Sequence, residues 1–405
     1  MTNNKLELLA PAGNFEKLKT AIYYGADAVY LGGKAFSLRA QADNFTNEEI
    51  LEAVKYAHER NVKIYVTANI FARNYDLDKA AEYFKFLQSA GVDAVLITDS
   101  GLIRLCKEVA PNLSIHLSTQ ANTLNKYTVK FWGEMGLERV VVARELSLAE
   151  IKEIHEFCPE VEIEAFIHGA MCISYSGRCL LSNYFNGRDA NRGECVQACR
   201  WHYEIREKTK EGDFCPIEED DRGTYILNSK DLNMMEHIGD MIKAGIVSFK
   251  IEGRMKSEYY LATVINAYRR AIDEFVKIGD DYSKNPMFYD ELLKTNHRVF
   301  TTAYMFGDNE KTVNYTDTQS TGNRQFIANV IGDGNGEYFT VQMRNRFKKG
   351  DVLEVLSPSE NFNKTFVVDR VTDEEGNDVE DAKLVQQTLR IYSNLMLKAG
   401  DILRR

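Results

Sequence analysis

The stretch LELLAPAGNFEKLKTAIYYGADAVYLGG, residues 6–33, indicates a strand, a helix and a second strand in direct succession. LELLAP and AVYLGG are short apolar runs, and FEKLKTAIYYG between them has a helical pattern. The next segment, TNEEILEAVKYAHERN (46–61), repeats the helical spacing, and its Thr46 precedes two acids as a helix N-cap does. Because strands and helices keep alternating through the first 170 residues, the sequence predicts a parallel sheet covered by helices.

The number of strands decides which parallel fold is expected. Besides the two runs above, seven others have the composition of buried strands, at 63–70, 94–99, 114–120, 139–146, 162–169, 224–232 and 247–255. A closed (β/α)8 barrel takes eight strands, so one of the nine candidates must be irregular or peripheral. We therefore predict an α/β fold with a TIM-barrel-like (β/α)8 domain at residues 1–310.

Two segments depart from this alternation. Residues 170–222 are too long for an ordinary loop and contain a group of cysteines, so we predict a cysteine-bearing insertion in the barrel. The turn-rich NYTDTQSTGNRQ indicates a linker, placed at 311–324. Short strand-like runs separated by Gly, Asn and Asp then predict a small all-β barrel domain at 325–405.

The charge balance limits the partners to be expected. The chain of 405 residues has 60 acidic and 50 basic side chains, a formal net charge of −10, which argues against a general nucleic-acid binder. The charge is uneven, because residues 243–256 hold four cations against the single acid Glu252. A small basic mouth on an acidic body suits a selective RNA enzyme. With no apolar run near 18 residues and no secretory signal, we expect a cytoplasmic protein with no membrane contact.

Polar side chains follow the predicted strands at the end where barrel enzymes build their active sites. Some of them could instead cap the helices that follow, and for Ser118, Thr119 and Asn122 the two interpretations stay equally open. The other members of this set are Thr67, Asn69, Gln120, Arg144, Glu145, His168, Asn228, Lys230, Asp231, Lys250, Glu252 and Arg254.

Four residues near these strand ends are favoured as functional. Period-two alternation along 162–169 places Glu164 and His168 on one face, so they should share the barrel mouth. Lys250 and Arg254 belong to the last predicted strand. Charges at a barrel mouth need partners, and substrates commonly supply them.

Four of the seven cysteines, Cys172, Cys179, Cys195 and Cys199, fall within 28 residues with the spacing C-x6-C-x15-C-x3-C. Disulfides are not expected, because nothing indicates export and cytosolic thiols stay reduced. Structural zinc sites prefer pairs with about two to four intervening residues, whereas an iron–sulfur cluster tolerates irregular spacing. The spacing leaves iron–sulfur, zinc and four unrelated buried cysteines open, with iron–sulfur slightly favoured over zinc.

The remaining cysteines and the arginines of the insertion carry weaker signals. Cys106 and Cys158 belong to helical runs and are expected in structural positions, while Cys215 is an outside candidate for a cluster ligand. Arginines beside aromatic rings hold unstacked bases and phosphates, and they also stabilise thiolate-bound clusters, so both roles stay open. The insertion interleaves its aromatic residues with Arg178, Arg188, Arg192 and Arg200.

The segment EAFIHGAMCISYSGRCLLSNYFNGRDANRGECVQACRW, residues 164–201, resembles the peptidase U32 family, also called collagenase-like proteases. The opening LLAPAGNFEKLKTAIYYGADAVYLG, the runs LNSKDL and KIEGRMKS and the β-rich C-terminal module are similar to that family too. The chain is most similar to the branch that supports prephenate-dependent 5-hydroxylation of the wobble uridine (position 34) of transfer RNA. For a peptidase, neither an H-E-x-x-H motif nor a G-x-S-x-G elbow is present in the sequence.

The resemblance implies a tRNA uridine 5-hydroxylase that takes prephenate as co-substrate and acts on tRNA, alone, as a homodimer or with a paralogous U32 subunit. Its four cysteines would hold a 4Fe–4S cluster. The alternatives are a U32-type peptidase, an enzyme for another RNA such as 23S rRNA, and a non-catalytic RNA-binding subunit. The C-terminal module and the arginines of the insertion would hold the RNA.

Residue roles within this reading are hypotheses. Prephenate carries two carboxylates, which Lys250, Arg254 and Arg144 would bind, because arginine offers bidentate geometry. Glu164 and His168 would handle protons near the base. The catalytic set is Glu164, His168, Lys250, Glu252 and Arg254, and the cofactor-binding set is Arg144, Lys230 and Arg178.

Overall fold

The computed structural model of the chain describes residues 6–37, 43–201, 219–220, 223–224, 229–279, 282, 284–307 and 320–405. Cys215 and Asn228 lie outside the described residues, as does the side chain of Arg200. Within the described part of the chain, no helix is long and apolar enough to cross a membrane.

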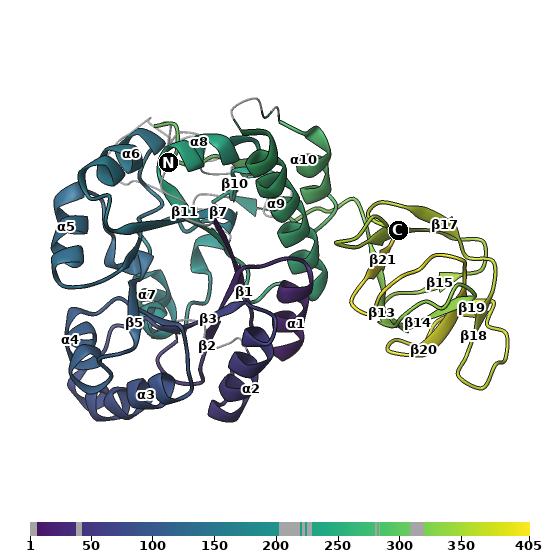
Figure 1. Cartoon of the computed structure of the whole chain (residues 1–405), viewed down its shortest axis with the longest axis horizontal. Coiled ribbons are helices and arrows are strands. Elements are labelled where there is room, and N and C mark those ends of the chain that lie inside the picture. The colour runs from purple at the N-terminus through teal and green to yellow at the C-terminus, as the bar shows by residue number, and fades with distance from the viewer. Residues whose placement is uncertain are drawn as a thin grey trace.

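Eight parallel strands close into a barrel with helices on its outside (Figure 1). Strands β1 to β7 pair in chain order, and β11 pairs with both β7 and β1, which closes the ring. This confirms the predicted (β/α)8 barrel. The strands are β1 (Glu7–Pro11), β2 (Ala28–Gly32), β3 (Lys63–Ala68), β4 (Ala94–Ile97), β5 (Ser114–Leu117), β6 (Arg139–Val141), β7 (Glu162–Ala170) and β11 (Ile246–Ile251).

Helices alternate with these strands along the chain, and two more accompany them. The strands are buried on both faces, as apolar parallel strands require. Outside the ring of eight, α7 (Leu181–Asn186) belongs to the cysteine segment and α10 (Pro286–Leu292) follows the last barrel helix. The alternating helices are α1 (Phe15–Tyr23), α2 (Asn47–His58), α3 (Leu77–Ser89), α4 (Ser100–Val109), α5 (Lys126–Glu134), α6 (Leu148–Phe157), α8 (Ile238–Lys243) and α9 (Glu258–Ile278).

Side-chain caps mark where the helices begin. Thr46 Oγ1 accepts a hydrogen bond from the Glu49 N–H at 3.1 Å, and the Glu49 carboxylate accepts one from the Thr46 N–H at 2.7 Å. This capping box confirms the predicted N-cap of α2. Helix α5 is capped by Asn125, whose side chain accepts from the Thr128 N–H at 3.0 Å.

The residues after β5 therefore do not cap the following helix. Ser118 precedes a short 3₁₀ helix, Thr119–Ala121, without a side-chain capping bond, and Asn122 ends that turn with a left-handed φ of 52°. The capping interpretation of Ser118, Thr119 and Asn122 is wrong, because a short 3₁₀ turn separates them from α5 and Asn125 occupies its N-cap position.

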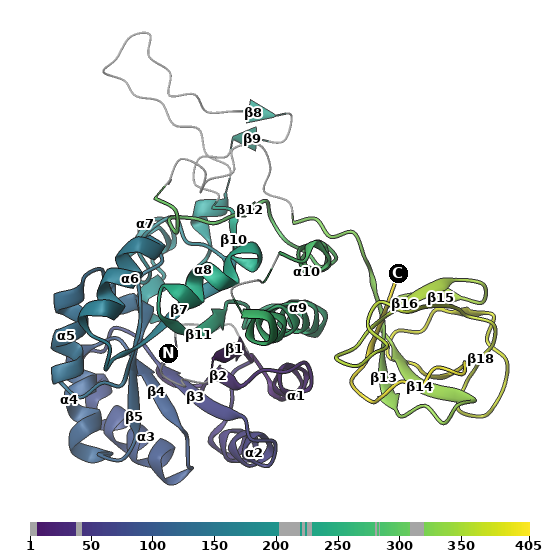
Figure 2. The same cartoon turned by 45° about the horizontal axis from the view of Figure 1, so that its top comes forward.

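The ninth candidate strand lies outside the ring. Of the run 224–232, the described end belongs to β10 (Asp231–Asn233), which pairs antiparallel with the end of β7 and parallel with β12 (Phe300–Thr301). The two-residue strands β8 (Glu219–Asp220) and β9 (Gly223–Thr224) pair only with each other among the described strands. Figure 2 shows α7, β10 and β12 together at one end of the barrel.

The C-terminal part is an antiparallel β domain beside the barrel (Figures 1 and 2), which confirms the predicted small all-β domain. Its seven-stranded sheet has the order β17-β16-β21-β13-β14-β20-β18, and a second core, with Phe339, Val341 and Leu389, is buried within it. The strands are β13 (Phe326–Gly332), β14 (Tyr338–Met343), β15 (Phe347–Lys348), β16 (Val352–Leu356), β17 (Thr365–Val367), β18 (Val371–Thr372), β19 (Asp381–Ala382), β20 (Thr388–Tyr392) and β21 (Ile402–Arg404).

The two domains are joined by buried polar contacts as well as by the chain. Arg404 of β21 donates two hydrogen bonds, of 2.5 and 2.9 Å, to the carboxylate of Glu291 in α10, and neither residue is exposed. Tyr24 of α1 donates to the Leu356 carbonyl oxygen at 2.9 Å. Tyr259 of α9 stacks on Phe326 with ring centroids 5.6 Å apart. Because these contacts involve three helices, the β domain has a defined position against the barrel.

Candidate active site

A buried arginine lies at the carboxyl ends of β2 and β3. Arg254, only 4% exposed, follows β11 and donates hydrogen bonds from Nη1 to Ser37 Oγ at 2.9 Å and to Thr67 Oγ1 at 3.2 Å. A Cβ atom on Gly32 would come within 2.1 Å of this nitrogen, so the close approach requires glycine there. Both hydroxyls accept hydrogen bonds from the guanidinium and hold it in place.

A second part of the β11 end is held by Tyr30 of β2. Its hydroxyl lies 2.9 Å from the Ile251 carbonyl oxygen and 3.3 Å from Glu252 Oε2, and the Lys250 ammonium lies 4.5 Å from its ring centroid. Glu252 is partly exposed, unlike Lys250. The structure therefore places Glu252 and Arg254 at the barrel mouth, as predicted for barrel-end residues.

Glu164 and Lys250 form an ion pair inside the barrel. The Lys250 Nζ donates to Glu164 Oε1 at 2.6 Å, and Arg139 lies 3.4 Å from the other carboxylate oxygen. Arg139 also donates to Glu7 at 2.5 Å. Burial raises the pKa of Glu7, but the charge of Arg139 and hydrogen bonds from Tyr65, Arg139 and Ser248 outweigh it and lower the pKa overall. These charges neutralise one another in the interior.

His168 lies apart from this network. Its ring packs against Tyr260 and Tyr268 of α9 and against Phe300, and its Nδ1 is 3.4 Å from the Tyr268 hydroxyl. Burial lowers the pKa of His168 to about 3, so the imidazole is neutral at neutral pH. Glu164 and His168 thus have separate surroundings.

A register shift explains the separation. Lys250 pairs with Phe166, but the next residue, Ile251, pairs with His168, so β7 has one residue more than β11 over this step. Such a bulge breaks the period-two alternation that placed Glu164 and His168 on one face. Contrary to the prediction, Glu164 and His168 do not share the barrel mouth.

Arg144 connects the β6 end to the cysteine segment. Its guanidinium donates to the Ala170 carbonyl oxygen at 2.9 Å and to Ser176 Oγ at 3.1 Å, and it lies 5.1 Å from the Phe166 ring centroid. The amide of Asn122 donates to the Ser176 carbonyl oxygen at 3.2 Å. Ser176 is thus a positioning residue that the sequence reasoning missed, because a loop serine carries no periodic signal.

The other two predicted binding residues lie at different points of the same end. Arg178 is exposed and its guanidinium lies 5.1 Å from the Phe71 ring centroid. Lys230 is partly exposed and immediately precedes Asp231, whose carboxylate is bound by Arg298 at 2.6 Å. Among the described residues, no contact of Arg178 or Lys230 with Arg144 is found.

Three polar oxygens near the mouth are buried without a hydrogen-bond partner in the described structure. They are Asn69 Oδ1, Asn122 Oδ1 and Glu145 Oε2. Burial raises the pKa of Glu145 although Arg144 beside it acts in the opposite direction. A buried acceptor without a donor is costly, so these oxygens are suited to receive donors from a bound molecule.

The cysteine segment packs onto the β3–α3 connection. Arg192 donates to both carboxylate oxygens of Asp76, at 2.9 and 3.1 Å, and to the Phe71 carbonyl oxygen at 2.9 Å. This fork-to-fork pair, which the sequence reasoning did not identify, fixes the segment over the carboxyl end of the barrel. Helix α7 lies within this segment (Figure 2).

None of the four clustered cysteines forms a disulfide in the described structure. Cys195 is exposed, the other three are partly buried, and Cys172 Sγ lies 3.5 Å from Ser174 Oγ. Among the described residues, no three His, Cys, Asp or Glu side chains are close enough to hold a metal ion. The donor set suits an iron–sulfur cluster in chemistry and number, but its arrangement here does not fit one.

Cys106 and Cys158 confirm their predicted structural positions. Both are buried in the main core, and burial raises the pKa of each thiol, that of Cys106 to about 12. Their thiols are therefore protonated and poor ligands or nucleophiles.

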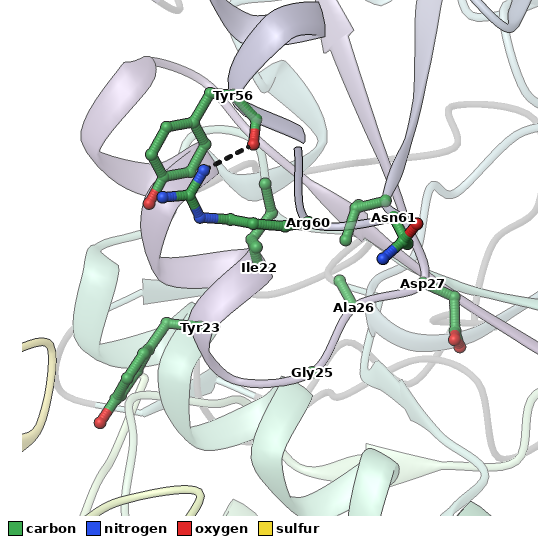
Figure 3. A pocket seen from close by; sticks show the side chains of 9 residues that line it. Ile22, Tyr23, Gly25, Ala26, Asp27, Tyr56, Arg60 and Asn61 are labelled. Atoms are coloured by element: carbon green, nitrogen blue, oxygen red, sulfur yellow. Dashed lines mark hydrogen bonds between the residues drawn. The ribbon is translucent and has the colours of Figure 1, made fainter. Parts of the chain in front are cut away.

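A depression of about 530 Å³ opens at the other end of the barrel (Figure 3). Gly25, Asp27 and Asn61 line it in the loops that precede β2 and β3, so it lies opposite the mouth. Arg60 is held by the protein itself, with its guanidinium 3.7 Å from the Tyr56 ring centroid and a 2.9 Å hydrogen bond to the Tyr56 carbonyl oxygen (Figure 3). Barrel enzymes do not use this end for chemistry.

A closed (β/α)8 barrel with a cysteine segment over its mouth and a docked antiparallel β domain defines the class of this protein. The chain belongs to peptidase family U32: the family's sequence profile matches residues 13–315, and the profile of the U32 C-terminal domain matches residues 322–404. This confirms the predicted family.

Relatives from bacteria share most of the chain. It is 43% identical to the tRNA hydroxylation protein P1 of Bacillus subtilis (strain 168), over 98% of this chain and 95% of that protein. It is 38% identical to the tRNA hydroxylation protein P of Escherichia coli (strain K12), over 89% of this chain and 88% of that protein. It is 36% identical to the 23S rRNA 5-hydroxycytidine C2501 synthase of the same organism, over 74% of this chain but 45% of that protein.

Proposed function

We propose that the protein is an RNA hydroxylase that acts on tRNA and introduces the 5-hydroxyl group of the wobble uridine (position 34). The observation that carries the proposal is the 43% identity to a tRNA hydroxylation protein over 98% of this chain. The alignments cover 95% and 88% of the two tRNA hydroxylation proteins, whereas only 45% of the rRNA synthase is matched. This difference favours tRNA over 23S rRNA.

The co-substrate in this proposal is prephenate. Its two carboxylates need fixed cations, and two arginines at the mouth are positioned by neutral acceptors. Arg254 is held by the hydroxyls of Ser37 and Thr67, and Arg144 by the Ala170 carbonyl oxygen and Ser176. Each guanidinium would bind one carboxylate of the co-substrate. Lys250 is less suited, because it is already paired with Glu164 inside the barrel.

The uracil ring would lie near the unpartnered oxygens of Asn69 and Asn122. Amide oxygens can accept a hydrogen bond from the N3–H of a uracil, which places the base by its edge. Proton handling cannot rest on His168, because its pKa near 3 makes it a weak base. Glu252, at the mouth beside Tyr30, is the better candidate for that role.

We also propose that Cys172, Cys179, Cys195 and Cys199 hold a 4Fe–4S cluster. What supports this is four cysteines in one segment over the mouth, none of which forms a disulfide among the described residues. Since the described arrangement does not gather them, the segment must rearrange when the cluster binds.

A peptidase is the second candidate, suggested by the family's name. The hydrogen bonds recorded for histidines in the described structure lead to Asp93, Tyr268, Asp240 and the Arg298 carbonyl oxygen, and none leads to a serine or cysteine. A nucleophilic peptidase needs such a nucleophile–base pair. The described geometry therefore favours the RNA enzyme.

The deciding experiment is mass spectrometry of tRNA nucleosides from a strain that lacks this protein and its paralogues. We expect derivatives of 5-hydroxyuridine to disappear and to return when the chain is supplied on a plasmid. Unchanged levels in the deletion strain would reject the assignment to tRNA.

A further inference from the structure

A cleft of about 780 Å³ separates the barrel from the β domain at the β11–α9 loop. One wall comes from the barrel and includes Lys256 and Tyr260, and the other comes from the start of the β domain and includes Arg324 and Phe326. This cleft is distinct from the barrel mouth, and neither the prephenate nor the base assignment uses it.

The lining of the cleft is strongly biased in charge. Three cations, Lys256, Arg324 and Arg405, line it, and no Asp or Glu is found among its described lining residues. The chain as a whole has the opposite bias, with a net charge of −10. Asparagine and glutamine side chains occupy four further positions, and Phe326 adds an aromatic ring. Cations, amides and aromatic rings without carboxylates are the composition that binds a single-stranded nucleic acid.

The three cations differ in the neighbours that their side chains contact. The side chain of Arg324 is 43% exposed, and its Nε is 4.0 Å from a Glu354 carboxylate oxygen. Lys256 lies 4.9 Å from the Tyr260 ring centroid, on the barrel wall. Arg405 is more firmly engaged, since it donates to Asp351 at 2.6 Å. Lys256 lines the cleft from the barrel side and Arg324 from the side of the β domain, so a nucleic-acid backbone in the cleft can reach both.

The cleft has a preformed shape because the domains are locked beside it. The Arg404–Glu291 pair is completely buried, and Lys294 binds Glu354 at 2.8 Å. The Tyr259–Phe326 stack forms part of the cleft itself. A site that exists before binding avoids the ordering cost that a hinged site would have.

The β11–α9 loop connects the cleft with the barrel mouth. Arg254 contacts Ser37 and Thr67 at the mouth, and Lys256, two residues later, lines the cleft. A chain with its base at the mouth could therefore continue with its backbone along this loop. A small anion would leave most of a cavity of this size empty, whereas several nucleotides would fill it.

We propose that this cleft binds the sugar–phosphate backbone of the RNA segment that adjoins the nucleotide in the barrel mouth. Lys256 and Arg324 contact phosphates from opposite walls, and Phe326 offers a surface for a base or ribose. The proposal rests on the proposed function, since it takes the substrate to be RNA. In this proposal the β domain forms one wall of the RNA site.

The test measures binding of a fluorescent RNA stem–loop with a uridine-containing loop to the full chain, by anisotropy between about 50 and 200 mM salt. We compare the wild type with K256A, R324A and the double variant. The control is the double variant R346A/R370A, which removes two exposed arginines of the same domain that pair with Asp381 and Asp378. Melting temperatures establish that all variants are folded.

We expect the double variant K256A/R324A to bind roughly tenfold more weakly, with a salt slope reduced by about 1.4, because each phosphate contact to a single strand contributes about 0.7. The control should bind within twofold of the wild type. If K256A/R324A keeps the wild-type affinity and slope while the wild type still restores tRNA hydroxylation in cells, the cleft assignment alone is wrong. If the wild type neither binds the stem–loop nor restores the modification, the proposed function fails as well.

Discussion

Inside the barrel, Lys250 donates a hydrogen bond to Glu164 across 2.6 Å, and both side chains are almost fully buried. Arg139 approaches the second oxygen of the same carboxylate at 3.4 Å. Lys250 thus depends on this carboxylate in the buried interior, whereas Arg139 also pairs with Glu7 and Glu162. In such a place an ion is stable only while its partner is present. The pair therefore acts first on the stability of the barrel.

The substitution Glu164→Gln tests this. It leaves Lys250 and Arg139 with less compensation, so we expect the free energy of unfolding to fall by about 3–5 kcal/mol. Urea unfolding followed by circular dichroism measures the change. The matched control is Glu162→Gln, which removes a partner of Arg139 whose side chain is 42% exposed; its cost should be about 1 kcal/mol or less. A Glu164→Gln protein as stable as the wild type but inactive would instead support the catalytic role proposed from the sequence.

The buried histidines make a second prediction, on pH. Burial lowers the pKa of His168 to about 3, and it lowers that of His116 well below its ordinary value, with Arg139 acting in the same direction. In the unfolded chain both titrate near pH 6.5. Below pH 6.5 the unfolded state therefore binds more protons than the folded state. The contribution of these histidines to the free energy of unfolding is complete above pH 6.5 and decreases as the pH falls below it.

We expect the free energy of unfolding to decrease by about 1.4 kcal/mol per pH unit for each of these histidines between pH 6 and pH 4.5. Urea titrations at several pH values measure the slope. His168→Phe keeps an aromatic ring among Tyr260, Tyr268 and Phe300. This variant should lower the slope by the contribution of one histidine, about 1.4 kcal/mol per pH unit. An unchanged slope in this variant would show that His168 is not protonated on unfolding in this range.

The third prediction concerns the interface between the β domain and the barrel. Arg404→Ala leaves the Glu291 carboxylate buried with Lys294 as its remaining charged partner, at 2.9 Å. Removal of one member of a buried ion pair costs about 3–5 kcal/mol. Because this pair joins the two domains, we expect calorimetry to show two separated unfolding transitions in place of one.

The control for this variant is Arg346→Ala in the same domain. That arginine pairs with Asp381 at 2.6 Å but is 67% exposed, so its loss should cost less than about 1 kcal/mol. A single transition at the wild-type temperature in Arg404→Ala would mean that the other contacts between the domains hold them together without the Arg404–Glu291 pair.

The barrel itself could be predicted because its signals are local. Apolar runs and helical spacing repeat with each unit, and Thr46 is the N-cap that the sequence indicates. The identity of the surplus strand could not be predicted, because the run 224–232 is as apolar as its neighbours. Only the tertiary structure shows that Asp231–Asn233 pairs antiparallel with the end of β7.

The positions of site residues were predicted correctly only where the end of a strand decides where a side chain lies. Arg254 and Glu252 follow β11 and lie at the mouth, as strand-end residues should. His168 was placed incorrectly, because one bulge between β7 and β11 reverses the face of every residue after it. The Arg404–Glu291 pair, 113 residues apart in the chain, has no signal in the sequence at all, because any arginine and any glutamate look alike until the fold brings two together.

The cysteines give the last prediction. If Cys172, Cys179, Cys195 and Cys199 hold one iron–sulfur cluster, replacing any one of them with alanine removes a ligand and should abolish both the colour of the protein and tRNA hydroxylation. Cys106→Ala is the control, since its thiol is fully buried in α4 with a pKa near 12, so colour and activity should persist. Anaerobic purification with an absorption spectrum and iron and zinc assays measures the first property, and nucleoside mass spectrometry the second. A colourless wild type with one equivalent of zinc would overturn the cluster assignment, because zinc has no redox chemistry to offer.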